Sequence, residues 1–124
     1  TCFAHGCMLS IANYGRRLQG YEGRPDLFGG TEHPSGFLSH KNVFFDTLVH
    51  DAYTLELMKR RVGVSQIIAG LDDPYPLGEM EGVGHSYPGR VINDAVENSI
   101  LKQEEANKIW KDNVLKWLDF SDFK

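Results

Sequence analysis

The sequence predicts an α/β fold built on parallel strands. Three short apolar runs, residues 1–4, 43–49 and 66–70, are rich in β-branched or aromatic side chains and end at polar or glycine positions, a pattern typical of buried parallel strands. Between these runs, apolar side chains recur at the spacing of a helix. Because strands and helices alternate along the chain, we expect parallel βαβ units in one sheet.

The first predicted strand, residues 1–4, is followed by a helix and then by an irregular segment. Apolar side chains at helical spacing begin at Leu9, and the helix is predicted to end near Gly20. Residues 21–41 contain four Gly and two Pro. We therefore expect no regular element there, but a functional loop or an arm that contacts another copy of the chain.

The second predicted strand, residues 43–49, ends at His50-Asp51 and leads into a helix. Apolar side chains at helical spacing cover residues 52–61, and Gly63 follows them. Because Gly is common just beyond the end of a helix, we expect this helix to stop at Gly63.

The third predicted strand, residues 66–70, leads into a loop rich in Pro and Gly at 74–89. Apolar side chains at helical spacing return over residues 91–96 and again over 103–118. The last segment has one apolar face, so it is predicted to be a single helix or a broken pair of helices.

Composition and charge exclude two classes of partner. The chain has 124 residues, of which 41% are hydrophobic and 24% charged, as in single globular domains. Its 13 basic and 17 acidic residues give a net charge of −4 and form no basic stripe, which argues against nucleic acid. No apolar run approaches the roughly 20 residues of a membrane span. Without a signal-peptide pattern either, we expect no membrane partner and a cytoplasmic location.

The cysteines and the first residue bear on the state of the chain. Cys2 and Cys7 flank a His and match neither a C-x-x-C pair nor a secreted disulfide framework, so we expect free thiols. The chain opens at Thr1 inside an apolar run, as if a strand had been cut. We expect residues 1–124 to be a single partial domain.

Polar side chains suited to catalysis follow each predicted strand. In parallel α/β folds the site forms at the carboxyl ends of the strands, where loops and helix N-termini converge. Side chains that ligate metals or move protons occupy these positions, namely His5, His50, Asp51, Asp72 and Asp73.

Three of these residues also have structural interpretations. Asp51 could cap the helix that begins at residue 52, and Asp73 could set a turn before Pro74. His50 could be a buried side chain whose hydrogen bonds are satisfied. The sequence leaves both interpretations open for each residue.

His5 and Asp72 are the strongest candidates for catalysis. Gly6 after His5 lets a substrate or metal approach the backbone closely, and a His with a pKa near neutrality suits acid/base work. Asp72 precedes Asp73-Pro74, a stiff exit that holds a carboxylate in one direction. Rigid placement is what a metal ligand or catalytic base requires.

Arg16 and Arg24 are candidates for binding a carboxylate. They lie eight residues apart around the predicted end of a helix, and the guanidinium fork binds carboxylates through two hydrogen bonds. The alternative is a pair of solvated surface arginines.

Other motifs that would indicate chemistry are absent. His33, His40 and His85 lie in predicted loops without a partner at metal-binding spacing, so we interpret them as surface residues. The sequence holds no H-x-H pair, no Gly-rich phosphate loop and no G-x-S-x-G motif.

An ordered series of motifs resembles one enzyme family. The chain carries C-F-A-H-G at 2–6, G-R at 15–16, R-P-D-L at 24–27, L-V-H-D at 48–51 and D-D-P-Y-P-L-G-E at 72–79. In this order they resemble the aminocarboxymuconate-semialdehyde decarboxylases and related decarboxylases of the amidohydrolase superfamily. The resemblance covers about two thirds of the chain.

The resemblance implies a TIM-type (β/α)₈ barrel of the metal-dependent hydrolase kind, with this chain as its last three β/α units. In that family a divalent metal, usually zinc with manganese as an alternative, is held by an H-x-H pair, a later His and an Asp. Asp72 matches that Asp, and His5 matches the His that acts as acid/base. Since the other ligands are missing, the metal would require N-terminal residues from outside the chain, and the isolated piece is expected to be inactive.

The resemblance also implies a reaction and an assembly. Arg16 and Arg24 match arginines that bind the substrate carboxylate, at least one of which reaches a neighbouring subunit's site. A homodimer or higher homo-oligomer is therefore implied, acting on a small unsaturated or aromatic carboxylate by nonoxidative decarboxylation. Two alternatives stay open: a related metal-dependent hydrolase or hydratase, and a noncatalytic α/β oligomerisation domain.

Overall fold

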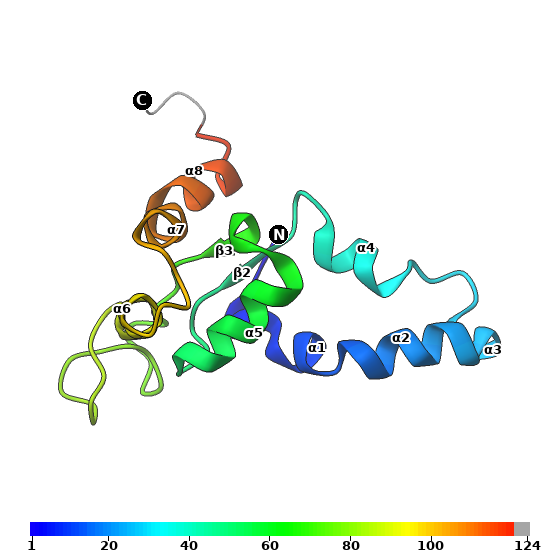
Figure 1. Cartoon of the computed structure of the whole chain (residues 1–124), viewed down its shortest axis with the longest axis horizontal. Helices are drawn as coiled ribbons and strands as arrows, with labels where there is room; N and C mark the ends of the chain where they lie inside the picture. The colour runs from blue at the N-terminus through cyan, green and yellow to red at the C-terminus, as the bar shows by residue number, and fades with distance from the viewer. Residues whose placement is uncertain (121–124) are drawn as a thin grey trace.

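The computed structural model describes residues 1–120 and contains a small parallel sheet. Its strands are β1 (Cys2–Phe3), β2 (Phe44–Asp46) and β3 (Ile67–Ile68), in the order β1-β2-β3. Both strand pairs are parallel, with Phe45 opposite Phe3 on one side and opposite Ile67 on the other. The three predicted strands and their direction are confirmed, although each paired segment is shorter than the apolar run that predicted it (Figure 1).

The order of the strands agrees with part of a barrel, as it would with one half of a doubly wound sheet. In a doubly wound sheet the strand order reverses at a switch point, whereas successive strands of a barrel lie side by side. Here neighbours in sequence are neighbours in the sheet. The α/β class is therefore confirmed, and the sheet is compatible with part of a barrel.

Helix α5 (Ala52–Val62) covers the sheet and closely matches its prediction. The Asp51 carboxylate accepts a hydrogen bond from the Thr54 amide at 2.8 Å, which caps the helix start. Gly63 ends the helix with a φ of 75°, a conformation that favours glycine. The helix buries four side chains against the core: Ala52, Leu55, Met58 and Val62.

The helix predicted to run from residue 9 to Gly20 is broken in two. Helix α1 (Met8–Ala12) ends at Asn13, and α2 (Tyr14–Gly23) continues beyond the predicted end. The Asn13 side chain donates a hydrogen bond to the Leu9 carbonyl at 2.9 Å. Such local bonding by Asn competes with helix continuation, which accounts for the break.

The prediction of an irregular segment at residues 21–41 is wrong. Besides the end of α2, this segment forms α3 (Pro25–Phe28) and α4 (Pro34–Ser39). Each of these short helices begins at a proline, whose fixed φ and missing N–H suit the first turn. The same prolines that favoured a loop in the sequence therefore start helices.

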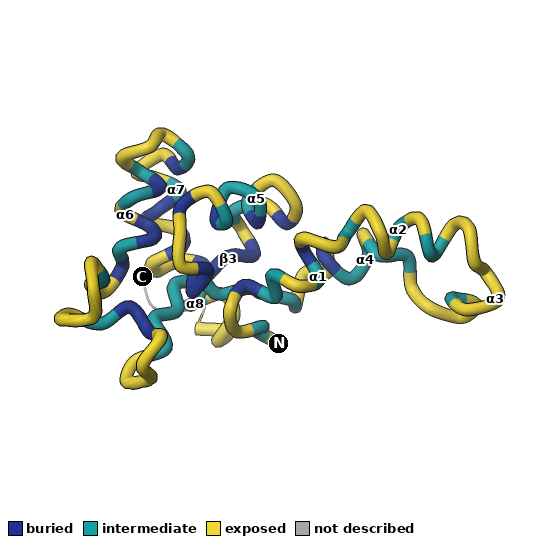
Figure 2. The backbone as a smooth tube through the Cα atoms, turned by 90° about the horizontal axis from the view of Figure 1, so that it is seen from below, coloured by how far each residue is buried: buried dark blue, intermediate teal, exposed yellow. Residues whose placement is uncertain are grey.

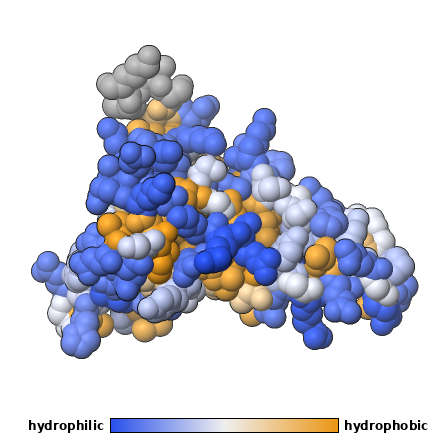
Figure 3. Space-filling model, viewed as in Figure 1, coloured by the Kyte–Doolittle hydropathy of each residue, from blue (hydrophilic) through white to orange (hydrophobic). Residues whose placement is uncertain are grey.

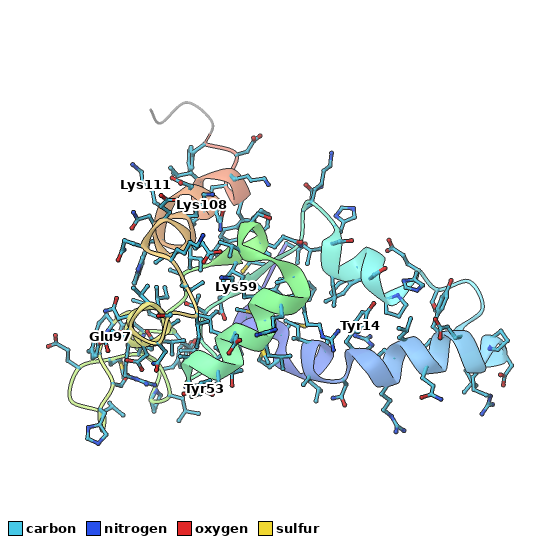
Figure 4. All side chains as sticks on the ribbon, viewed as in Figure 1. Tyr14, Tyr53, Lys59, Glu97, Lys108 and Lys111 are labelled. Atoms are coloured by element: carbon cyan, nitrogen blue, oxygen red, sulfur yellow. The ribbon has the colours of Figure 1, made fainter. Side chains whose placement is uncertain are left out.

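Residues 14–39 form an arm that extends from the body of the molecule (Figures 1 and 2). Neither α2 nor α3 has a buried residue, and Figure 2 shows their backbone as mostly exposed. Tyr14 lies where the arm leaves the body (Figure 4), and the Arg61 guanidinium of α5 stacks over its ring at 4.9 Å. This cation–π contact fixes the base of the arm.

The remaining helices follow β3 in the chain, and the last of them pack against it. Helix α6 (Arg90–Glu97) is followed by α7 (Gln103–Asn107), a π-helical turn η3 (Lys108–Asp112) and α8 (Asn113–Trp117). The last three are continuous, and residues 103–117 are called the tail helix below. The prediction of a helix or broken pair over 103–118 is thus confirmed, with a π turn at the irregularity.

Lys59 links α5 to the start of the tail helix (Figure 4). Its ammonium donates to the Ile100 carbonyl at 2.8 Å and to the Glu105 carboxylate at 2.7 Å. The hydrogen bond from Lys59 lowers the pKa of Glu105. Both side chains are partly shielded, so this pair stabilises the helix packing more than a fully exposed pair would.

One hydrophobic core joins the sheet, α5, α6 and the tail helix. Its largest side chains, all fully buried, include Phe45, Leu55, Met58, Ile67 and Ile109. On the face drawn in Figure 3, hydrophobic surface shows mainly on the body, and the arm is mostly hydrophilic or neutral. Within residues 1–120, no helix has the length and apolar character needed to cross a membrane.

Candidate functional site

The structure brings together two of the predicted site residues, His5 and Asp72. His5 follows β1 and Asp72 follows β3, so they come from the two outer strands of the sheet. The His5 Nε2 and Asp72 Oδ2 atoms are 3.8 Å apart, with 60% of the His5 side chain and 26% of the Asp72 side chain exposed. An imidazole thus lies beside a half-buried carboxylate at the carboxyl edge of the sheet.

Both residues have a left-handed backbone. The φ angles are 54° at His5 and 56° at Asp72. His5 lies in the turn η1 (Ala4–Cys7), where Gly6 and Cys7 are also left-handed. For residues other than Gly such conformations cost of order 1–3 kcal/mol and tend to occur at functional sites, so the surroundings must hold these turns.

Asp46, at the end of the central strand, holds the turn that carries His5. Its Oδ1 atom accepts hydrogen bonds from the Gly6 amide at 2.9 Å and from the Leu48 amide at 3.2 Å. Burial and the Asp46 carboxylate together raise the pKa of the nearby Cys2 thiol to about 11. Both effects favour the neutral thiol, so Cys2 is a poor nucleophile.

Thr47, which is buried, joins β2 to the segment that leads to Asp72. Its hydroxyl accepts a hydrogen bond from the Gly70 amide at 3.1 Å and donates to the Gly70 carbonyl at 3.4 Å. Asp46 and Thr47 were not among the sequence candidates. The sequence does set them apart, since both are polar residues inside an otherwise apolar run.

Glu79 anchors the loop that follows Asp72. Its amide donates to the Leu71 carbonyl at 2.8 Å, which closes the loop around Asp72. Glu79 is only 3% exposed, and its carboxylate accepts hydrogen bonds from the Gly89 and Val91 amides at 2.8 and 3.1 Å. A buried carboxylate paired in this way at the start of α6 is well stabilised.

His50, Asp51 and Asp73 surround this pair without joining it. His50 is exposed, so its interpretation as a buried side chain is wrong; its carbonyl accepts a hydrogen bond from Arg90 at 2.6 Å. Asp51 caps α5, as the structural alternative predicted. Although burial opposes ionisation, hydrogen bonds from Thr54 keep the pKa of Asp51 below its usual value. Asp73 is exposed on the loop after Asp72.

Arg16 and Arg24 lie on the arm, and within residues 1–120 neither has an ion pair or hydrogen bond with His5 or Asp72. Both are exposed, and both line a hollow of about 660 Å³ on α2 and α3. Arg24 donates two hydrogen bonds to the Asp26 carboxylate, at 2.8 and 2.6 Å. These bonds raise the pKa of Arg24 and lower that of Asp26.

The remaining histidines and the cysteines agree largely with the sequence analysis. His40 and His85 are exposed. His33 is half-buried, with its ring against Tyr21 and its Nδ1 atom 2.7 Å from the Ser35 hydroxyl. Cys2 and Cys7 are free thiols.

The donors in this segment do not form a complete metal centre. An imidazole and a carboxylate are ligands that zinc accepts, but zinc sites use three or four protein ligands. Among the described residues, no three His, Cys, Asp or Glu side chains converge on one point. His5 and Asp72 therefore fit only part of such a centre.

The fold and the placement of His5 and Asp72 are those of a segment of a parallel α/β protein with polar residues at its strand ends. The chain is a parallel α/β segment with a His and an Asp at its strand ends, which is where barrel enzymes carry their active sites. No family model matches the chain.

Two curated relatives identify the kind of enzyme that it resembles. The chain is 36% identical over 121 residues to the 2-amino-3-carboxymuconate-6-semialdehyde decarboxylase of Caenorhabditis elegans, covering 98% of the chain and 28% of that protein. It is 31% identical over 106 residues to the enzyme of the same name from Dictyostelium discoideum, covering 84% of the chain and 27% of that protein. The resemblance seen in the motifs is confirmed, and the chain is homologous to about a quarter of these decarboxylases.

Proposed function

We propose that this chain is one segment of a metal-dependent nonoxidative decarboxylase that acts on an unsaturated or aromatic carboxylate. The observation that carries the proposal is the His5–Asp72 pair at the carboxyl edge of a parallel sheet, in a chain similar to two decarboxylases. The rest of the barrel would come from residues outside this segment. In that setting residues 1–124 form a single partial domain.

His5 is the proposed proton donor. When the bond between carbon and the carboxylate breaks, CO₂ leaves and the electron pair stays on the carbon, which then needs a proton. A partly exposed imidazole can deliver that proton and recover it from water.

Asp72 is the proposed ligand from this segment to a divalent ion, either zinc or manganese. The ion would supply positive charge to hold the substrate. The other ligands would come from outside this segment, since no three His, Cys, Asp or Glu side chains converge among residues 1–120. Gly78 and Glu79 support Asp72, since a Cβ at Gly78 would lie 2.7 Å from the Asp72 carbonyl oxygen.

Arg16 and Arg24 are proposed to bind substrate carboxylate. They lie at α2 and α3, the two helices of the arm without a buried residue, and this position fits delivery to the site of a second subunit, and hence a homodimer or a higher oligomer. Leu27, which is 65% exposed, lies at the same hollow as both arginines. Arginine is enriched at protein interfaces, whose buried centre is more apolar than the rest of the surface.

The arm also favours a second candidate, a noncatalytic α/β domain that self-associates. In that case its helices would be covered by another copy, while His5 and Asp72 would have no chemical role. A related hydrolase or hydratase would keep those roles and direct water to a different bond.

The test is decarboxylation by a full-length protein that contains this chain, before and after the changes His5→Ala and Asp72→Ala. His5→Ala is expected to lower kcat by about 10²–10⁴-fold, as loss of an acid/base group does. Asp72→Ala is expected to lower it at least as much, through loss of a ligand to the ion. His85→Ala and Asp73→Ala are matched controls, since both side chains are exposed. Activity that survived both site changes would exclude the proposed roles.

A further inference from the structure

The Asp46 carboxylate lies between the two turns that carry the candidate site. Asp46 is the last residue of the central strand and is paired with Ile68 of β3. On the other side, the Gly6 amide donates to its Oδ1 atom at 2.9 Å. The Leu48 amide donates to the same oxygen at 3.2 Å, which fixes the direction of the carboxylate.

The Gly6 hydrogen bond acts directly on the conformation of His5. The Gly6 amide belongs to the peptide bond that joins His5 to Gly6, so holding it fixes ψ of His5. Three successive residues are left-handed in this turn, with φ of 54°, 59° and 49° at His5, Gly6 and Cys7. Such a run is unfavourable for L-residues and needs a specific contact to persist.

The same side chain also packs against the segment that leads to Asp72. A Cβ at Gly70 would lie 2.6 Å from the Asp46 Cβ and 2.9 Å from its Oδ2. The Asp46 side chain therefore fills the space that Gly70 leaves open, two residues before Asp72. One side chain thus contacts both halves of the site, which come from opposite edges of the sheet.

We propose that Asp46 is a positioning residue that holds the His5 side chain beside Asp72. The inference builds on the proposed function only in giving His5 its chemical role. Asp46 itself acts through its Oδ1 atom, which accepts the hydrogen bond from the Gly6 amide. Asn at this position keeps an acceptor oxygen, whereas Ala removes it, so the two substitutions separate the hydrogen bond from the negative charge.

The structural part of the proposal is tested on the 124-residue chain by amide hydrogen exchange. In Asp46→Ala, exchange at Gly6 relative to the core amide of Leu55 is expected to accelerate about tenfold, as for a lost hydrogen bond. Asp46→Asn is expected to stay within a few-fold of the original chain. The matched control is Asp51→Ala. The Asp51 carboxylate also follows the central strand, but it accepts a hydrogen bond from the Thr54 amide and not from Gly6.

The catalytic part is tested in the full-length protein that contains the chain. Asp46→Ala is expected to lower kcat by about 10²-fold with little change in KM, because a misplaced acid/base group slows the chemical step. Asp46→Asn is expected to recover most of that loss. A merely structural defect would instead reduce the amount of folded enzyme and would not be rescued selectively by Asn.

The two readouts separate this inference from the proposed function. If the unchanged full-length protein does not decarboxylate any carboxylate, the function fails while the exchange data still decide the role of Asp46. Unchanged Gly6 exchange in Asp46→Ala, or a change no larger than in Asp51→Ala, overturns the inference. An equal loss of kcat in Asp46→Asn and Asp46→Ala also overturns it, because charge rather than the hydrogen bond would then matter.

Discussion

At the scale of single residues, the turn after β1 depends on the absence of a side chain at Gly6. Its φ is 59°, and a Cβ there would lie 2.5 Å from the Val49 Cγ1 and 3.1 Å from the Met58 sulfur. Real Cβ atoms essentially never approach another atom as closely as 2.5 Å. The turn that presents His5 therefore packs directly on the core beneath it.

Gly6→Ala is expected to lower the free energy of unfolding by about 2–4 kcal/mol, from backbone strain and overpacking together. Gly84→Ala is the matched control, because Gly84 has the same φ of 59° but no atom near its Cβ position. It is expected to cost only about 1 kcal/mol, from strain alone. Urea unfolding of the two variants measures both values, and equal losses would contradict the close packing at Gly6.

Residues that directly follow a strand could be predicted from the sequence. His5 and Asp72 were found because they end apolar runs, and the structure brings them to 3.8 Å. Asp46 and Thr47 were missed because they lie inside such a run, where the sequence indicated only a strand. The functional signal of a polar residue within a buried strand depends on which neighbouring turns it reaches, and that is a tertiary property.

At the scale of elements, the tail helix covers the outer edge of β3. In its π turn, the Asn113 amide bonds the Lys108 carbonyl, which leaves the Ile109 carbonyl without its usual helical partner. The Ala69 amide donates to that carbonyl at 3.0 Å. The irregular turn therefore has a structural cause, since it satisfies a backbone group at the edge of the sheet.

Asn113→Ala is expected to lower the free energy of unfolding by about 2 kcal/mol, because two carbonyls would lose their donor. The buried Asn113 side chain donates to the carbonyls of Val64 and Ile67, at 2.8 and 2.7 Å. Asn107→Ala, at an exposed position of the same helix, is expected to change stability by less than about 0.5 kcal/mol. Thermal unfolding of both variants is the measurement, and similar losses would show that the edge contact is unimportant.

Elements with strong apolar patterns could be predicted, and those without one could not. The strands and α5 follow from their buried side chains and, for α5, from Asp51 and Gly63 at its ends. The short helices α3 and α4 together bury a single residue, Leu38, so no periodic pattern reveals them. In that segment the position of each proline at a helix start mattered more than the number of prolines.

At the scale of the whole molecule, the proposed metal centre is divided between this chain and residues outside it. The purified 124-residue chain, incubated with zinc and then dialysed, is expected to retain well below one zinc ion per chain, because a useful site takes three or four protein ligands. Asp72→Ala is the control and is expected to give the same result. Elemental analysis that found one zinc per chain, lost in Asp72→Ala, would contradict this division.

The contacts of the tail helix also affect how the sheet can be extended. β1 and β3 are its two edges, and the outward groups of β3 already bond the Ile109 carbonyl and the Asn113 side chain. A strand that paired with β3 along this edge would compete with the tail helix for these groups. Closure of a larger barrel around this segment would then be an exchange reaction, in which the last strand to enter releases the helix.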